Sequence, residues 1–149
     1  MTSTPATDKM APGSAPLHLK ELKAGDAATA ARWDAFVDTC PQATFFHKAG
    51  WQRIVSEVFK HRPHFLYAER AGTLEGVLPL AQVKSLLFGN SLVSLPFAMY
   101  GGVAALSQEA VELLEQEAQT RARRLRVDHL EMRNVEQRHA DWPTQDLYV

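Results

Sequence analysis

The sequence predicts an α/β domain in which helices flank a mixed, mostly antiparallel sheet. Two segments with helical spacing of apolar residues precede three strand-like segments that short turns separate, and a third helical segment leads to another strand-like segment. Helices that alternate with a central antiparallel meander imply a mixed sheet covered by helices. The expected order is β-α-α-β-β-β-α-β, and 149 residues suit a single domain.

Composition narrows the class of protein. Hydrophobic residues make up 46% of the chain, charged residues 22%, and the formal net charge is −1. These values indicate a soluble globular protein and argue against a whole-surface nucleic-acid binder, so we expect no DNA partner. A single cysteine, Cys40, excludes an intrachain disulfide and fits a reducing compartment. We expect no membrane span, no secretory signal and a cytoplasmic protein, because no long apolar run occurs.

The N-terminal part divides into a tail, a strand and a helix. Residues 1–16 are rich in Thr, Ser, Ala, Pro and Gly and are expected to form a disordered tail, which leaves 17–149 as the domain. Alternation after Leu17 predicts a short edge strand. Asp26 is the expected N-cap of a helix that Pro41 ends, with apolar positions at Trp33, Phe36, Val37 and Cys40. Cys40 is expected to be a buried thiol, since no base is placed beside it.

The clearest helical period follows a loop at 41–50. It predicts one buried stripe at spacings i, i+3, i+4, i+7 and i+8: Trp51, Ile54, Val55, Val58 and Phe59. Segments 65–70, 74–87 and 91–95 then form the expected meander. Pro79 should mark a bulge or an unpaired edge position, because proline has no N–H to donate to a sheet.

The last third of the chain is expected to hold a helix capped by Ser107, a strand at 127–133 and the start of another strand at 146–149. Glutamates occupy the first half of the helix and arginines the last, which complements the helix dipole. The arginine cluster could bind phosphate, but dipole complementarity and solvation explain it without a ligand.

Motifs for several chemistries are missing. The sequence has no G-x-x-x-x-G-K-S/T loop, no G-x-G-x-x-G, no H-E-x-x-H and no paired cysteines, so we predict no metal site. The six histidines are scattered and are expected to be structural or surface residues. No residue is predicted to be catalytic.

Two short segments are candidates for a binding site. Lys48 and Trp51 lie three residues apart and share a side if Lys48 starts the helix, so Lys48 would neutralise a phosphate and Trp51 would stack on a sugar or base. Alternatively, Trp51 belongs to the core and Lys48 is solvated. Tyr100-Gly101-Gly102 follows a strand and offers bare backbone to a ligand. Alternatively, it is a turn that needs positive φ, with the tyrosine packed over it.

Several short segments follow one another in a recognisable order: 43–47 (ATFFH) with Trp51, 76–80 (GVLPL), 83–85 (VKS), 88–89 (FG), 92–97 (LVSLPF), 100–102 (YGG) and 130–133 (LEMR). In this order they resemble the FemAB family, in particular its PEP-CTERM/exosortase-associated branch, and the resemblance covers 17–149. The expected order of helices and strands is that of the GNAT acyltransferase fold. Members of this family have two GNAT-like halves, and this chain is similar to the N-terminal half.

The resemblance implies transfer of an acyl or aminoacyl group to an amine of a cell-envelope or exopolysaccharide-related precursor. It implies that Lys48, Trp51, Tyr100, Gly101 and Gly102 face a diphosphate-sugar or peptide-type acceptor. The donor, aminoacyl-tRNA or acyl-CoA, is a co-substrate, and no cofactor is expected. The Q/R-x-x-G-x-G/A loop of typical acetyl-CoA-binding relatives is absent, which argues against an ordinary acetyl-CoA site.

Two other functions stay open at this point. The chain could be a non-catalytic acceptor-binding or dimerisation module, which pairs as a homodimer or with a missing C-terminal GNAT-like half. It could also be a small GNAT N-acetyltransferase.

Overall fold

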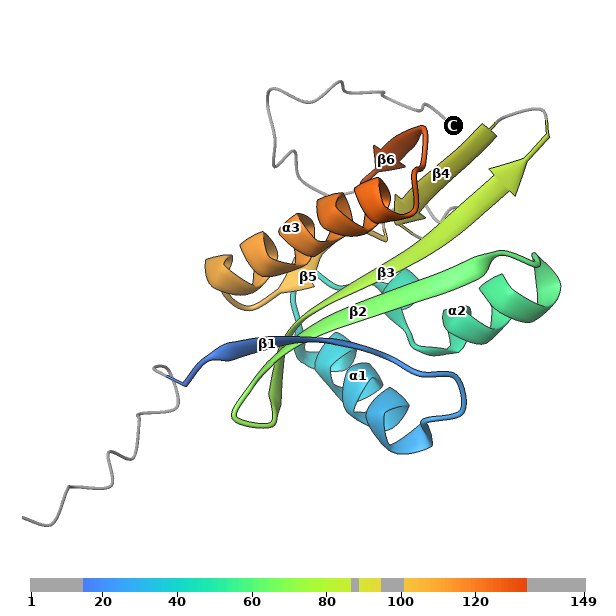
Figure 1. The fold of residues 1–149 in the computed structure, drawn as a ribbon. Coiled ribbons are helices and arrows are strands. Elements are labelled where there is room, and N and C mark those ends of the chain that lie inside the picture. The colour runs from blue at the N-terminus through green and yellow to red at the C-terminus, as the bar shows by residue number, and fades with distance from the viewer. Residues whose placement is uncertain (1–14, 87–88, 95–100, 134–149) are drawn as a thin grey trace, which may run out of the picture.

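The computed structural model describes residues 15–86, 89–94 and 101–133 (Figure 1). The first half holds β1 (Leu17–Glu21), α1 (Ala27–Thr39), the 3₁₀ turn η2 (Phe45–His47), α2 (Gly50–Arg53), the π-helical turn η3 (Ile54–Val58) and β2 (Arg62–Arg70). The second half holds β3 (Thr73–Ser85), β4 (Gly89–Ser94), β5 (Ala104–Ala105), α3 (Gln108–Arg124) and β6 (His129–Glu131). The expected order of helices and strands is confirmed, and the short β5 is an addition.

The strands form one mixed sheet in the order β1-β2-β3-β4-β6, and β5 pairs with β3. Every pairing is antiparallel except β4 with β6, which is parallel. The helices α1 and α2 lie on one face of the sheet and α3 crosses the other (Figure 1). The predicted fold class is therefore confirmed. The strand expected at 146–149 lies outside the described residues.

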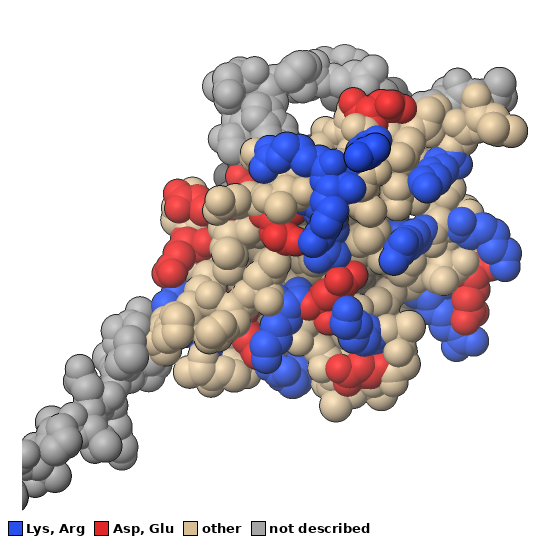
Figure 2. Space-filling model, in the orientation of Figure 1, with Lys and Arg blue, Asp and Glu red and all other residues tan. Residues whose placement is uncertain are grey.

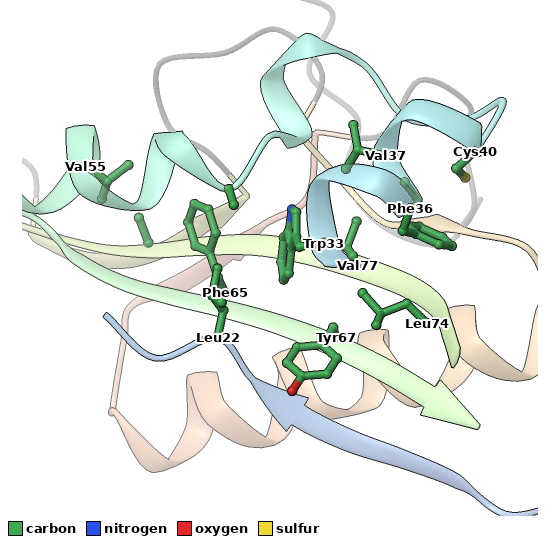
Figure 3. Close-up of a cluster of buried hydrophobic side chains, with 13 residues drawn as sticks. Leu22, Trp33, Phe36, Val37, Cys40, Val55, Phe65, Tyr67, Leu74 and Val77 are labelled. Carbon is green, nitrogen blue, oxygen red and sulfur yellow. The ribbon is translucent and has the colours of Figure 1, made fainter. Parts of the chain in front are cut away.

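Alternation along the central strands builds two cores from one sheet. Phe65 and Tyr67 of β2 face α1, whereas Leu66 and Ala68 between them face α3, because successive side chains of a strand point to opposite faces. Trp33 of α1 is fully buried and stacks on Phe65 with ring centroids 5.5 Å apart (Figure 3). Ala49 is buried in this first core, and Phe46 and Trp51 pack against it.

The helix expected at 51–60 differs from the prediction in its second half. Val55 is buried, but Val58 is 66% exposed and Phe59 37% exposed. The amide of Phe59 donates to the carbonyl of Ile54 at 3.2 Å, an i to i+5 bond that marks the π-helical turn. A π turn holds more residues than an α turn, so it rotates the later side chains away from the buried stripe.

Pro79 of β3 lies opposite Phe65 of β2. Along this edge of β3, β5 pairs with Gly76 and Val77, and β4 pairs with Leu80 to Ser85. Among the described strands, none pairs with Leu78 and Pro79 on that side. Residues 95–100, which follow β4, lie outside the described residues, so the expected unpaired edge position at Pro79 stays a prediction. The register shift between β2 and β3 lies between Ala68 and Glu69 rather than at Pro79.

The expected helix caps are also confirmed. The side chain of Asp26 accepts the amide of Thr29 at 3.1 Å, and that of Ser107 accepts the amide of Ala110 at 3.2 Å. Cys40 follows the last residue of α1 and is buried, as predicted.

Candidate functional site

The loop between α1 and α2 is held in shape by its own side chains. Thr44 caps η2, because its hydroxyl oxygen accepts the amide of Phe46 at 3.2 Å. The amide of Thr44 in turn donates to Nδ1 of His47 at 2.9 Å. This is a capping box in which a histidine takes the place of the usual Glu or Gln. The loop therefore has a defined shape without any ligand.

Lys48 and Trp51 make separate contacts. Lys48 follows η2 and forms an ion pair with Asp38 of α1. Trp51 donates its indole N–H to the carbonyl of Phe45 at 3.2 Å and lies 5.8 Å from that ring and 5.7 Å from the ring of Phe46. The helix α2 begins at Gly50, so Lys48 lies outside it. Lys48 and Trp51 therefore do not share one side of a helix, contrary to the expectation. The three rings form an aromatic cluster, and Phe45 is 69% exposed.

The glycine corner, Gly101 and Gly102, is buried. Both amides donate to the carbonyl oxygen of Arg133, Gly101 at 3.2 Å and Gly102 at 3.0 Å. These two N–H groups are therefore used within the protein and do not point unpaired at a ligand. Tyr100, the third member of the predicted segment, lies outside the described residues.

His47 joins the two predicted segments. Its Nε2 lies 2.7 Å from the carbonyl oxygen of Gly102, and its own carbonyl accepts the indole N–H of Trp33 at 2.6 Å. The side chain is almost fully buried, and this burial lowers the pKa of His47. The ring is therefore neutral at pH 7. The structure thus brings the Lys48–Trp51 loop and the glycine corner together through His47, one of the six histidines expected to be structural or surface residues.

A signal for His47 was present in the sequence. Thr44 and His47 have the spacing of a capping box, in which the third residue after the cap reaches back to the cap amide. Histidine is an unusual member of this motif. Its contact with Gly102, across 55 positions of sequence, depends on how the chain folds and has no local signal.

The arginines at the end of α3 are held by carboxylates. Arg121 contacts Glu21 of β1 at 3.0 Å and Glu117 at 3.2 Å, and Arg124 contacts Glu117 at 3.5 Å. Basic side chains gather over the end of α3 and the neighbouring part of the sheet (Figure 2). Ion pairing and the helix dipole account for Arg121 without a ligand.

Other features of the described residues do not add to the site. An open hollow of about 410 Å³ lies at the β3–β4 turn, where Lys84, Asn90 and Asp128 contribute to its lining, and contains none of the predicted site residues. Among the residues described, no three His, Cys, Asp or Glu side chains are grouped so that they could hold a metal ion. The described helices include none with the length and apolar character needed to cross a membrane.

Comparisons with known proteins bear on the fold. No family model matches the sequence, and no curated protein matches it. A crystal structure described as a GNAT family acetyltransferase from Staphylococcus aureus matches with a TM-score of 0.54 and 10% identity, over 88% of this chain and 98% of that chain. At this identity the likeness concerns the fold alone, so the chain has a GNAT-type fold.

Proposed function

We propose that this chain is the N-terminal half of a FemAB-like acyl- or aminoacyltransferase, and that the loop 44–51 beside the glycine corner binds the acceptor. The observation that carries the proposal is the 2.7 Å contact between His47 Nε2 and the Gly102 carbonyl, because it brings two independently predicted segments together. The GNAT-type fold supports an acyltransferase class. The acceptor is an amine of a cell-envelope or exopolysaccharide-related precursor.

The chemistry of such a transfer depends mainly on positioning. An amine of the acceptor attacks the activated ester of an aminoacyl-tRNA or the thioester of an acyl-CoA, and the protein orients the two reactants. Lys48 contributes a cation for the diphosphate, and the cluster of Phe45, Phe46 and Trp51 offers an apolar surface for a sugar or base. Gly101 and Gly102 let the acceptor approach the backbone closely but offer it no free amide donor, since the carbonyl of Arg133 already accepts both amides. Tyr100 stays a predicted neighbour of these two glycines.

The first test is a titration with a UDP-linked peptidoglycan precursor. Thermal melts with and without the precursor should show a Tm that rises with ligand concentration, because binding to the folded state alone stabilises it. Light scattering on the same samples gives the mass in solution. A monomer stabilised by the precursor supports the proposal. A dimer whose Tm ignores the precursor contradicts it and favours the dimerisation module.

An N-acetyltransferase that uses acetyl-CoA is the second candidate, and the GNAT-type fold favours it. Against it, the sequence lacks the usual phosphate loop, and the amides of Gly101 and Gly102 are already paired. Titration with acetyl-CoA separates the two candidates. Saturable binding of acetyl-CoA supports this second candidate, whereas our proposal predicts none at this corner.

A further inference from the structure

His47 is only 1% exposed, and both of its ring nitrogens have hydrogen-bond partners. Nδ1 lies 2.9 Å from the amide nitrogen of Thr44, and Nε2 lies 2.7 Å from the carbonyl oxygen of Gly102. A backbone N–H can only donate and a carbonyl oxygen can only accept. The ring must therefore accept at Nδ1 and donate from Nε2, which defines the neutral tautomer that carries its proton on Nε2.

This tautomer lies in a chain of hydrogen bonds that crosses the end of the sheet. Thr44 donates to His47, His47 donates to the carbonyl of Gly102, and Gly102 donates to the carbonyl of Arg133. The amide of Arg133 then donates to the hydroxyl of Ser94, which is fully buried at the end of β4, at 2.6 Å. These bonds link the loop at η2, the glycine corner, Arg133 and the end of β4, and together they hold these parts in one arrangement.

The backbone of His47 is fixed as firmly as its ring. Its carbonyl accepts the indole N–H of Trp33, which is fully buried in the core beneath α1. Lys48 follows directly in the chain, and the amide of Trp51 donates to the carbonyl of Lys48 at 3.2 Å. The position of His47 therefore sets where Lys48 and Trp51 lie with respect to Gly102.

We infer that His47 is a positioning residue, which holds the Lys48–Trp51 loop against the glycine corner through its Nε2–H bond to Gly102. The inference rests on the proposed function, since it names the residue that brings the two parts of that acceptor site together. His47 does not touch the acceptor. It acts by fixing the geometry of groups that do.

Two substitutions distinguish the hydrogen bond that Nδ1 of His47 accepts from the one that Nε2 donates. His47→Gln places an amide nitrogen near the position of Nε2 and keeps a donor for Gly102, whereas His47→Asn reaches only to the position of Nδ1 and loses that donor. Both variants remove the imidazole from the same buried place, so each controls for the loss of packing in the other. The probe is the UDP-linked peptidoglycan precursor, and the readouts are its Kd and the exchange rates of the Gly101 and Gly102 amides.

We expect His47→Asn to raise the Kd about tenfold and to speed exchange of the Gly102 amide by a similar factor, which is the size of effect that one buried hydrogen bond has. His47→Gln should stay within about threefold of the unaltered protein in both readouts. Equal losses in the two variants would overturn the inference, because a purely structural histidine makes no distinction between its two bonds.

A measurement on the unaltered protein tests the inference even if the variants do not fold. Nitrogen-15 NMR of the His47 ring should show the proton on Nε2 and an unprotonated Nδ1. A proton on Nδ1 would overturn the inference.

The two proposals fail in different ways. Absence of precursor binding to the unaltered protein contradicts the proposed function, while the amide exchange rates still test the contact between His47 and Gly102. Normal precursor binding with identical Kd values in the Asn and Gln variants contradicts the positioning role and leaves the proposed function intact.

Discussion

Lys48 and Asp38 form an ion pair that ties the loop after η2 to α1. The side chain of Lys48 is 31% exposed and that of Asp38 64% exposed, so the pair lies at the surface and is screened by solvent. Asp38 compensates the positive charge of Lys48, the residue that we propose contacts the diphosphate of the acceptor. A phosphate of that ligand would therefore compete with Asp38 for the same ammonium group.

This competition predicts opposite effects for the two partners. Lys48→Ala should raise the Kd for the UDP-linked precursor by about three- to tenfold, because a charge-assisted contact is lost at an exposed site. Asp38→Asn should lower the Kd, because it frees Lys48. Isothermal titration calorimetry at fixed salt measures both.

Lys23→Ala is the matched control, since Lys23 is also an exposed lysine near a carboxylate, Glu21, at 3.7 Å. It should leave the Kd unchanged. An equal effect of Lys23→Ala and Lys48→Ala would mean that only net charge matters and would remove Lys48 from the site.

His64 predicts how stability depends on pH. It is a buried residue of β2, and its Nδ1 accepts a hydrogen bond from Arg121 of α3 at 3.1 Å. Burial, followed by the positive charge of Arg121, lowers the pKa of His64 from 6.5 to about 4, and Glu21 offsets this only in part. The unfolded chain takes up the proton near pH 6.5, whereas the folded chain resists it, so the free energy of unfolding should fall as pH drops from 6.5 to 4. The loss amounts to roughly 3 kcal/mol.

Urea unfolding at several pH values between 4.5 and 7 measures this slope. Burial also lowers the pKa of His47, which adds a loss of the same sign. His64→Asn isolates the contribution of His64, because the amide oxygen can still accept from Arg121 but does not titrate. An unchanged slope in His64→Asn would refute the assignment. The NMR titration of the His64 ring provides an independent value.

The π-helical turn predicts a contrast between two valines that a regular helix would bury together. Val55→Ala should destabilise the protein by about 2 kcal/mol, because it removes buried methyl groups. Val58→Ala should change stability by no more than about 0.5 kcal/mol, because Val58 is exposed. Comparable losses of stability from the two substitutions, measured by urea unfolding, would contradict the π-helical turn and indicate a regular α-helix.

Gly76 lies where β3 approaches α3 and β5. An added Cβ would lie 2.9 Å from Cδ1 of Leu114, 3.2 Å from Cβ of Ala105 and 3.3 Å from Cβ of Ala110. Leu114 can rotate, but the two alanine methyl groups move only with their backbones. We therefore expect Gly76→Ala to cost about 1–3 kcal/mol in urea unfolding.

Gly50→Ala is the matched control, because a Cβ at Gly50, the first residue of α2, meets nothing within 4 Å. It should be neutral or stabilising by up to about 1 kcal/mol, since alanine loses less backbone freedom in a helix. A loss at Gly50 as large as that at Gly76 would contradict the close approach of α3.

Local patterns in the sequence predict the longer helices and strands of this fold and their order, but not the short β5 or the π-helical turn. Apolar spacing and the helix caps Asp26 and Ser107 act over a few residues, so their consequences can be read from neighbours in the chain. The same patterns predict the two segments of the candidate site. Whether Lys48, Trp51 and the glycine corner bind an acceptor stays a prediction.

Contacts between distant segments depend on the tertiary structure. The π turn that exposes Val58 overrides a clear helical period, and Asp38 pairs with Lys48 across the end of α1. The bond from His47 to Gly102 spans 55 positions, and it exists because η2 and the segment just before β5 meet at the same corner of the sheet. No local pattern records such a meeting, since it follows from how α1 packs its tryptophan on β2 and so places the loop that holds His47.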